Sequence, residues 1–238
     1  MPNTYFQFKQ FIIHQDKCAM KVCTDSCLFG AWINKILKGN KFAQALDIGT
    51  GTGLLSLIAS QGYDLNIDAI EIEENAAIQA KENVSASKWK GRISVYHQSL
   101  QTFTPPNKYD VIFSNPPFYE NDLMSDEEGK NAAKHNTTLT LGEIISFISK
   151  NLSEEGLAMI LLPFHRLDYF EQILSKEKLY LKEKVLVRQT PKHDYFRAMI
   201  CFAKIKPEQS ITREIIIRDK ENEYSEEFRE LLEEYYLC

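Results

Sequence analysis

Ala45-Leu46-Asp47-Ile48-Gly49-Thr50-Gly51-Thr52-Gly53-Leu54-Leu55 decides the fold of this 238-residue chain. The mostly apolar stretch at residues 42–48 is typical of a buried strand, and three glycines on alternate positions follow it. Glycine permits positive φ angles and a close approach between backbone and ligand, so a strand, a tight loop and a helix are predicted in that order. The spacing is G-x-G-x-G; Leu54 stands where an NAD-binding loop has its last glycine.

The rest of the chain alternates strand and helix patterns around this loop. Strands are predicted at residues 42–48, 65–72, 93–97, 109–114, 156–162, 179–188 and 196–205, and helices at residues 24–38, 54–60, 73–85, 141–151, 165–175 and 225–236. This alternation predicts an α/β fold, Rossmann-like, with a mostly parallel seven-stranded sheet and helices on both faces. Residues 211–218 are a candidate for one further strand. Ligands bind such sheets at the carboxyl ends of the strands.

The ends of the chain and one long polar stretch lie outside this alternation. Residues 4–14 alternate aromatic and polar side chains and predict an extended or hairpin arm. We expect residues 1–40 to form an arm and helix packed on the α/β core at residues 41–238, within one structural domain. The polar stretch at residues 119–140 is expected to form a lid or a segment that orders on binding.

Composition excludes several classes of protein. The N-terminus has no secretory signal pattern, and the apolar runs are too short for a membrane span. Five cysteines, an odd number, favour reduced thiols and a cytoplasmic location, and no metal site is expected because the cysteines lack a fourth ligand at suitable spacing. The net charge is −5, yet residues 176–206 hold nine Lys and Arg against three Asp and Glu. No pattern specifies an oligomer, so a monomer is favoured.

Two carboxylates beside the glycine loop indicate which ligand it binds. Asp47 precedes the loop, and a carboxylate there is unfavourable for a pyrophosphate but suits the ammonium of an amino-acid moiety. Glu71 ends the next predicted strand, where it can accept hydrogen bonds from both hydroxyls of a ribose. The loop itself contains no Lys or Arg to neutralise phosphates. Together these features point to S-adenosylmethionine as the cofactor.

Asn115-Pro116-Pro117-Phe118 follows the buried strand predicted at residues 109–114. The two prolines fix φ and remove backbone donors, which leaves carbonyl groups pointing outward. An asparagine amide and a ring face complete a loop that can hold a planar amino group. These four residues are therefore the predicted catalytic set.

The motifs resemble those of known enzymes. The glycine loop and Glu71 resemble the class I S-adenosylmethionine-dependent methyltransferases, and Asn115–Phe118 resembles the N/D-P-P-Y/F motif of the amino-methylating branch. Together with residues 8–11, 18–22, 24–25 and 28–32, the chain resembles the bacterial tRNA1(Val) (adenine-37-N6)-methyltransferase family. The resemblance implies a set of cofactor-binding residues: Lys21, Thr24, Asp47, Gly49, Thr50, Gly51, Gly53, Glu71, Ile72, Ser99, Leu100 and Asn115.

Two positions depart from this resemblance. Gln98-Ser99-Leu100 stands where such methyltransferases often carry an acidic residue for the adenine of the cofactor, so Ser99 or a backbone amide must act there. Cys23 stands where the family often has glycine.

The resemblance implies methylation of the N6 amine of adenine 37 in tRNA, without a metal. The candidate RNA-contacting residues are Lys9, Arg188, Lys192, His193 and Arg197. The acceptor motif alone leaves three alternatives open: a glutamine-amide methyltransferase of a release factor, a guanine-N2 methyltransferase of ribosomal RNA, and a non-catalytic RNA-binding module that retains the fold.

Overall fold

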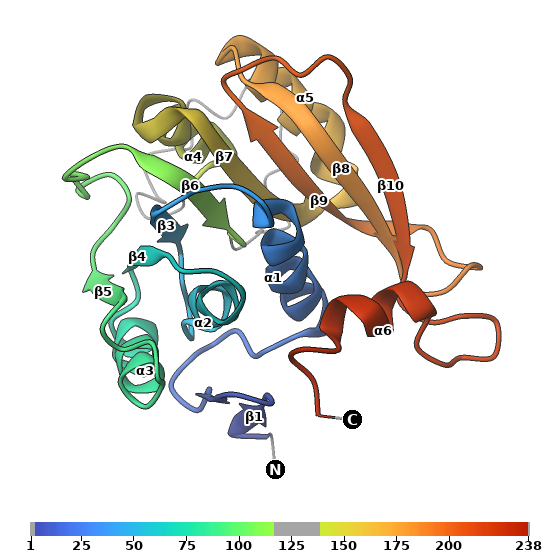
Figure 1. Ribbon diagram of the computed structural model, residues 1–238, viewed down its shortest axis with the longest axis horizontal. Coiled ribbons are helices and arrows are strands. Elements are labelled where there is room, and N and C mark those ends of the chain that lie inside the picture. The colour runs from blue at the N-terminus through green and yellow to red at the C-terminus, as the bar shows by residue number, and fades with distance from the viewer. Residues whose placement is uncertain (1–2, 117–138, 238) are drawn as a thin grey trace, which may run out of the picture.

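A mixed sheet runs through the molecule and carries helices on both faces (Figure 1). The structure is a computed structural model that describes residues 3–116 and 139–237. Residues 119–138 of the expected lid, together with Pro117 and Phe118, lie outside the described residues. The strands in their spatial order are β10 (Ile211–Ile216), β8 (Tyr180–Arg188), β9 (Tyr195–Ala203), β7 (Leu152–Pro163), β6 (Tyr109–Ser114), β3 (Gln44–Ile48), β4 (Asn66–Glu71) and β5 (Ile93–His97).

Neighbouring strands of the sheet are parallel except where β9 is inserted antiparallel between β7 and β8. The α/β fold and the mostly parallel sheet are as predicted, but the strand count of seven is wrong for the described residues. The eighth strand, β10, pairs parallel with the outer edge of β8, where it satisfies backbone groups that would otherwise be unpaired. Ile215 of this strand is buried, while its first three residues are exposed.

The helices divide into two layers. They are α1 (Thr24–Leu37), α2 (Leu54–Gly62), α3 (Glu74–Ser85), α4 (Leu141–Asn151), α5 (Leu167–Lys176) and α6 (Glu226–Leu232). Helices α1, α2 and α6 pack in one apolar cluster, and α4 and α5 pack in a second cluster on the other face of the sheet. Alternate residues of β7 supply both clusters, since successive side chains of a strand point to opposite faces: Met159 joins the first and Ile160 the second. A short 3₁₀ helix, η4 (Phe164–Arg166), connects β7 to α5.

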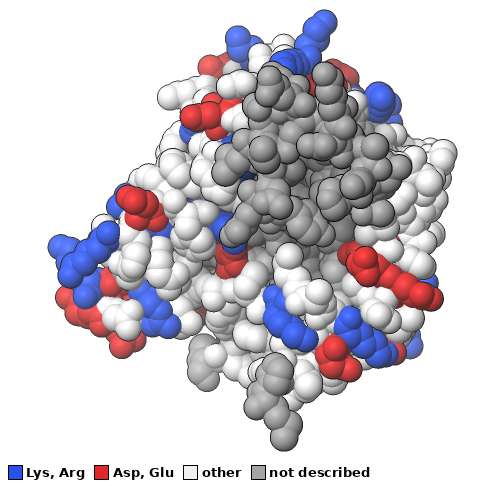
Figure 2. Space-filling view, turned by 180° about the vertical axis from the view of Figure 1, so that it is seen from behind, with Lys and Arg blue, Asp and Glu red and all other residues white. Residues whose placement is uncertain are grey.

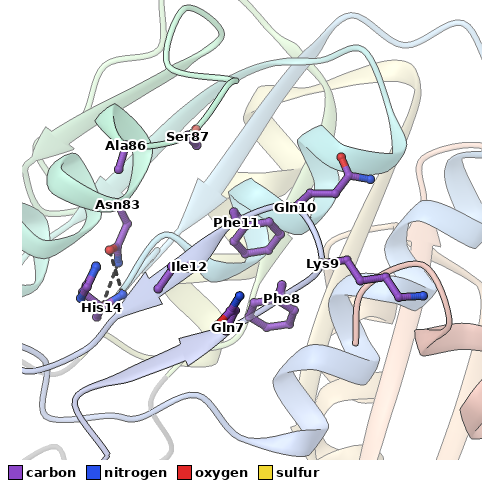
Figure 3. Close-up of a pocket in the computed structure, with 10 residues that line it drawn as sticks. All are labelled: Gln7, Phe8, Lys9, Gln10, Phe11, Ile12, His14, Asn83, Ala86 and Ser87. Atoms are coloured by element: carbon purple, nitrogen blue, oxygen red, sulfur yellow. Dashed lines mark hydrogen bonds between the residues drawn. The ribbon is translucent and has the colours of Figure 1, made fainter. Parts of the chain in front are cut away.

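The predicted N-terminal arm is an antiparallel hairpin of β1 (Tyr5–Gln7) and β2 (Ile12–His14), separate from the main sheet. Phe8, Phe11 and Ile13 are buried in the same cluster as α1, α2 and α6. Asn83, fully buried on α3, accepts a hydrogen bond from the His14 backbone N–H (2.9 Å) and donates one to its carbonyl (2.8 Å), as Figure 3 shows. The arm is therefore attached to the core by polar as well as apolar contacts.

No helix in residues 3–116 and 139–237 is long and apolar enough to cross a membrane. Over the same ranges no group of three His, Cys, Asp or Glu side chains could hold a metal ion.

Candidate active site

The glycine loop joins the carboxyl end of β3 to α2 in the predicted position. Gly49 and Gly51 adopt positive φ angles of 70° and 56°, and a Cβ added to either would project into open space. The backbone N–H groups of Gly49 and Thr50 donate to the Ile70 carbonyl at 2.9 and 3.0 Å, which attaches the loop to β4. The loop thus presents a surface without side chains at these two glycines, as a ligand packed against the backbone requires.

Asp47 stabilises this loop through buried hydrogen bonds. Its side chain is completely buried, and Oδ2 accepts hydrogen bonds from Thr50 Oγ1 (2.6 Å) and Ser56 Oγ (2.7 Å). Burial raises the pKa of Asp47 to about 6, against the opposing effect of these two donors. The second oxygen, Oδ1, has no hydrogen-bond partner among the described residues. One oxygen shapes the loop, and the other is available to an ammonium group directly or through water.

Glu71, the last residue of β4, also stabilises the loop, through a hydrogen bond from Gly51. Its Oε2 accepts from the Gly51 backbone N–H (2.8 Å) and its Oε1 from the Glu73 backbone N–H (2.9 Å). A carboxylate oxygen has two lone pairs, so both oxygens can still accept a hydroxyl proton. Ile72, the next residue, is 50% exposed and offers an apolar surface beside this carboxylate.

The carboxyl end of β5 lies close to the carboxyl end of β4. Gln98 N–H donates to the Glu71 carbonyl (2.9 Å), and His97 Nε2 lies 3.0 Å from the Ile72 carbonyl. Ser99 follows directly; its hydroxyl lies 3.0 Å from Thr102 Oγ1, and Leu100 is buried in the second apolar cluster. The predicted cofactor residues of three neighbouring strands therefore lie along one edge.

The N-terminal arm continues toward the same edge. Burial raises the pKa of the Cys18 thiol to about 11, with Glu71 adding to the rise and Lys21 opposing it, so both charges lie near Cys18. Lys21 Nζ donates to the Gln15 carbonyl, which holds the arm in a bend. Thr24 begins α1 and is half-buried.

The predicted acceptor loop lies beside the glycine loop. Ser114 pairs with Ile48 in adjacent strands, and its hydroxyl donates to the Ile48 carbonyl (2.7 Å), one residue before Gly49. Asn115 follows immediately and is half-buried; its Nδ2 donates to Ser26 Oγ of α1 at 2.9 Å. Pro116 is buried. The amide of Asn115 is therefore held at the carboxyl edge, next to the glycine loop.

The predicted RNA-contacting residues divide into paired and exposed groups. Arg188 forms an ion pair with Glu214 (2.8 Å), and Arg197 forms one with Asp25 (2.7 Å). Lys9 donates to the carbonyl of Glu233 in the C-terminal segment. By contrast, Lys192 and His193 are exposed in the turn between β8 and β9.

The position of that turn follows from the strand directions. Since β9 is antiparallel to β7, Tyr195 and the preceding turn lie at the same edge as Asn115. On the face in Figure 2, Lys and Arg are interspersed with Asp and Glu over the described surface.

Three site residues were missing from the sequence-based predictions. Ser26 contacts Asn115, Ser56 contacts Asp47, and Asn83 donates to the Thr52 carbonyl (2.9 Å) while it holds the arm at His14. The only sequence signal for Asn83 and Ser56 was a polar residue on a helix face that is otherwise buried. Ser26 resembled an ordinary polar residue of a first helical turn.

These features fit S-adenosylmethionine. The bare backbone at Gly49 and Gly51 leaves room for a bound molecule, Asp47 Oδ1 is a buried acceptor beside it, and Glu71 offers carboxylate oxygens for a ribose. The fold and this site together define a class I S-adenosylmethionine-dependent methyltransferase.

Comparisons with known proteins narrow the class. The family model of the Methyltransferase small domain matches residues 31–157. A tRNA1(Val) (adenine(37)-N6)-methyltransferase from Bacteroides thetaiotaomicron is 41% identical over 239 residues, which cover 100% of this chain and 99% of the relative. The chain belongs to the tRNA1(Val) (adenine(37)-N6)-methyltransferase family.

Solved structures agree on the fold. A predicted O-methyltransferase from Agrobacterium tumefaciens superposes with a TM-score of 0.66 at 13% identity, over 88% of this chain and 96% of that one. The ribosomal protein L11 methylase from Lactobacillus delbrueckii subsp. bulgaricus gives 0.53 at 19% identity, over 74% of this chain and 78% of the other.

Proposed function

We propose that this chain transfers a methyl group from S-adenosylmethionine to the N6 amine of adenine 37 in tRNA1(Val). The observation that carries the proposal is the junction of β3 and β6, where the Ser114 hydroxyl bonds to the Ile48 carbonyl. That bond joins the residue before Asn115 to the residue before Gly49, which supports Asn115 as the residue that binds the amine beside the glycine loop. Full-length relatives that bear this activity in their names support the choice of substrate.

The acceptor residues solve the chemical difficulty of the reaction. When bound, S-adenosylmethionine supplies a sulfonium methyl group that is already electrophilic. The amine of adenine is the weaker partner, because its lone pair is delocalised into the ring. In the proposed complex Asn115 Oδ1 and the Pro116 carbonyl accept one hydrogen bond each from the two N–H groups of the amine. This arrangement directs the nitrogen lone pair out of the ring plane. Such positioning is worth ~7–11 kcal/mol of the barrier.

The proposal needs no general base. The amine becomes cationic as its nitrogen bonds to the methyl carbon and the carbon–sulfur bond of the donor breaks, with the neutral thioether as the leaving group. Its proton then leaves readily to solvent. Asp47 has a pKa of about 6 but is buried and bonded to Thr50 and Ser56, so in this proposal it holds the loop and offers Oδ1 to the cofactor, and it does not act as a base. Phe118, which lies outside the described residues, completes the proposed site as a ring stacked on the base.

The substrate must present an unstacked base, which suits an anticodon loop. In this proposal Lys192 and His193 contact RNA phosphates, because they are exposed at the edge that carries Asn115. Arg188 and Arg197 support the β8–β9 turn through their carboxylate partners. We also propose that the protein acts as a monomer in the cytoplasm.

One assay separates the proposal from its alternatives. Purified protein is incubated with methyl-labelled S-adenosylmethionine and, in separate reactions, unmodified tRNA, ribosomal RNA or release factor, and the labelled product is digested and identified. The proposal expects N6-methyladenosine from tRNA. Label on guanine or glutamine would assign the chain to one of the other amino-methylating reactions, and no label on any acceptor would favour the non-catalytic alternative.

A further inference from the structure

The orientation of the Asn115 amide decides whether the proposed acceptor can work. An asparagine side chain has an accepting oxygen at one end and a donating NH₂ at the other, and rotation about its last torsion exchanges them. If Nδ2 faced the substrate amine, two donors would meet. A site that uses Asn115 Oδ1 therefore needs something that fixes the opposite end.

Ser26 contacts that opposite end. Asn115 Nδ2 donates to Ser26 Oγ at 2.9 Å, and Ser26 is only 6% exposed. The contact joins residues 89 positions apart, from the first turn of α1 to the loop after β6. A hydroxyl can donate as well as accept, so Ser26 alone would be compatible with either orientation of the amide.

The direction comes from the group behind Ser26. Its Oγ lies 2.9 Å from Cys23 Sγ. A thiol is a weak donor, so the hydroxyl is the better donor of this pair and the Ser26 proton points to the sulfur. The Ser26 oxygen is then left to accept from Asn115.

We propose that Cys23, Ser26 and Asn115 form a directed hydrogen-bond relay that keeps Asn115 Oδ1 facing the acceptor amine. This relay rests on the proposed role of Asn115. Ser26 and Cys23 are positioning residues in it, since they act through Asn115 and do not touch the substrate.

The test is a comparison of Ser26→Ala in two backgrounds. In the otherwise wild-type chain, Ser26→Ala leaves the Asn115 N–H group without its buried partner and frees the amide to rotate. We expect on the order of a 10-fold fall in the single-turnover rate of methyl transfer, with an unchanged dissociation constant for S-adenosylhomocysteine. Ser26→Thr, which keeps the hydroxyl, should restore most of the rate.

The second background is Asn115→Asp, whose two oxygens are both acceptors, so that rotation no longer matters. In that background Ser26→Ala should change the rate by less than about twofold, because coupled residues are non-additive. Ser60→Ala is the matched control: Ser60 is a buried helical serine whose hydroxyl has no hydrogen-bond partner among the described residues. It should leave the rate unchanged.

Two results would overturn the relay: a wild-type rate in Ser26→Ala, or an equal fold-loss in both backgrounds. If Ser26→Ala does not fold by circular dichroism, Cys23→Ala against Cys23→Ser makes the same comparison, with the hydroxyl expected to retain the rate and the methyl to lose it. Equal rates for those two variants would also contradict the relay. If the wild-type chain labels guanine or glutamine, the proposed function fails, and the same comparison is made on that NH₂ group.

Discussion

Glu71→Gln tests how the cofactor loop is built. Glu71 is 8% exposed, and its two oxygens accept one backbone N–H each, from Gly51 and Glu73. A glutamine keeps one acceptor and turns an NH₂ group toward the other N–H. The variant therefore loses one charge-assisted hydrogen bond and leaves a buried donor unpaired, at a cost of about 1.5–3 kcal/mol. Because the loop must be ordered to bind its ligand, the dissociation constant should rise roughly 10- to 150-fold.

Isothermal titration with S-adenosylhomocysteine measures this constant without any RNA. The matched control is Glu74→Gln, which removes an exposed carboxylate from the first turn of α3, three residues further on. Circular dichroism establishes that both variants are folded. If Glu71→Gln bound within threefold of wild type, the claim that Glu71 organises the loop and receives the ribose would be refuted.

Three further predictions concern other parts of the site. Asn115→Ala should lower the rate of methyl transfer by roughly 10²- to 10³-fold and leave S-adenosylhomocysteine binding within about twofold; a wild-type rate would contradict the acceptor role. Because burial raises the pKa of Asp47 from 3.8 to about 6, the native state binds that proton more tightly than the unfolded chain does. Its contribution to the free energy of unfolding is then greatest below pH ~4 and falls by about 3 kcal/mol as the pH rises through ~6. Urea denaturation across this range should show the fall in wild type and not in Asp47→Asn; parallel curves would count against it. Lys192→Ala should weaken tRNA binding and reduce the slope of the logarithm of the binding constant against the logarithm of salt concentration by about one. Lys176 is an exposed lysine at the end of α5, and Lys176→Ala should change neither quantity.

Local patterns predicted the central part of the fold. The run from Ala45 to Leu55 has one compatible geometry, since three alternate glycines after a buried strand leave room only for a tight loop before the helix. Glu71 followed from the length of the next helix and strand. The edge strand β10 was harder, because its outer residues are exposed and only Ile215 is buried among them. Its pairing partner, β8, is what makes it a strand.

The contacts between distant segments could not be predicted. Nothing in the spacing of Ser26 and Asn115 indicates that α1 packs against the end of β6. Charge counts likewise made Arg188 and Arg197 resemble RNA-binding residues, because composition does not reveal that Glu214 and Asp25 lie opposite them. A count of basic residues reports how many cations a segment has, and only the packing reports how many are already paired.

The most direct test of the central claim is the position of the methyl group in RNA. An unmodified tRNA1(Val) transcript is incubated with the purified chain and S-adenosylmethionine, cut into fragments and analysed by mass spectrometry. The proposed function predicts one N6-methyladenosine, at position 37 of the anticodon loop. A methyl group at another position, or on another base, would contradict it.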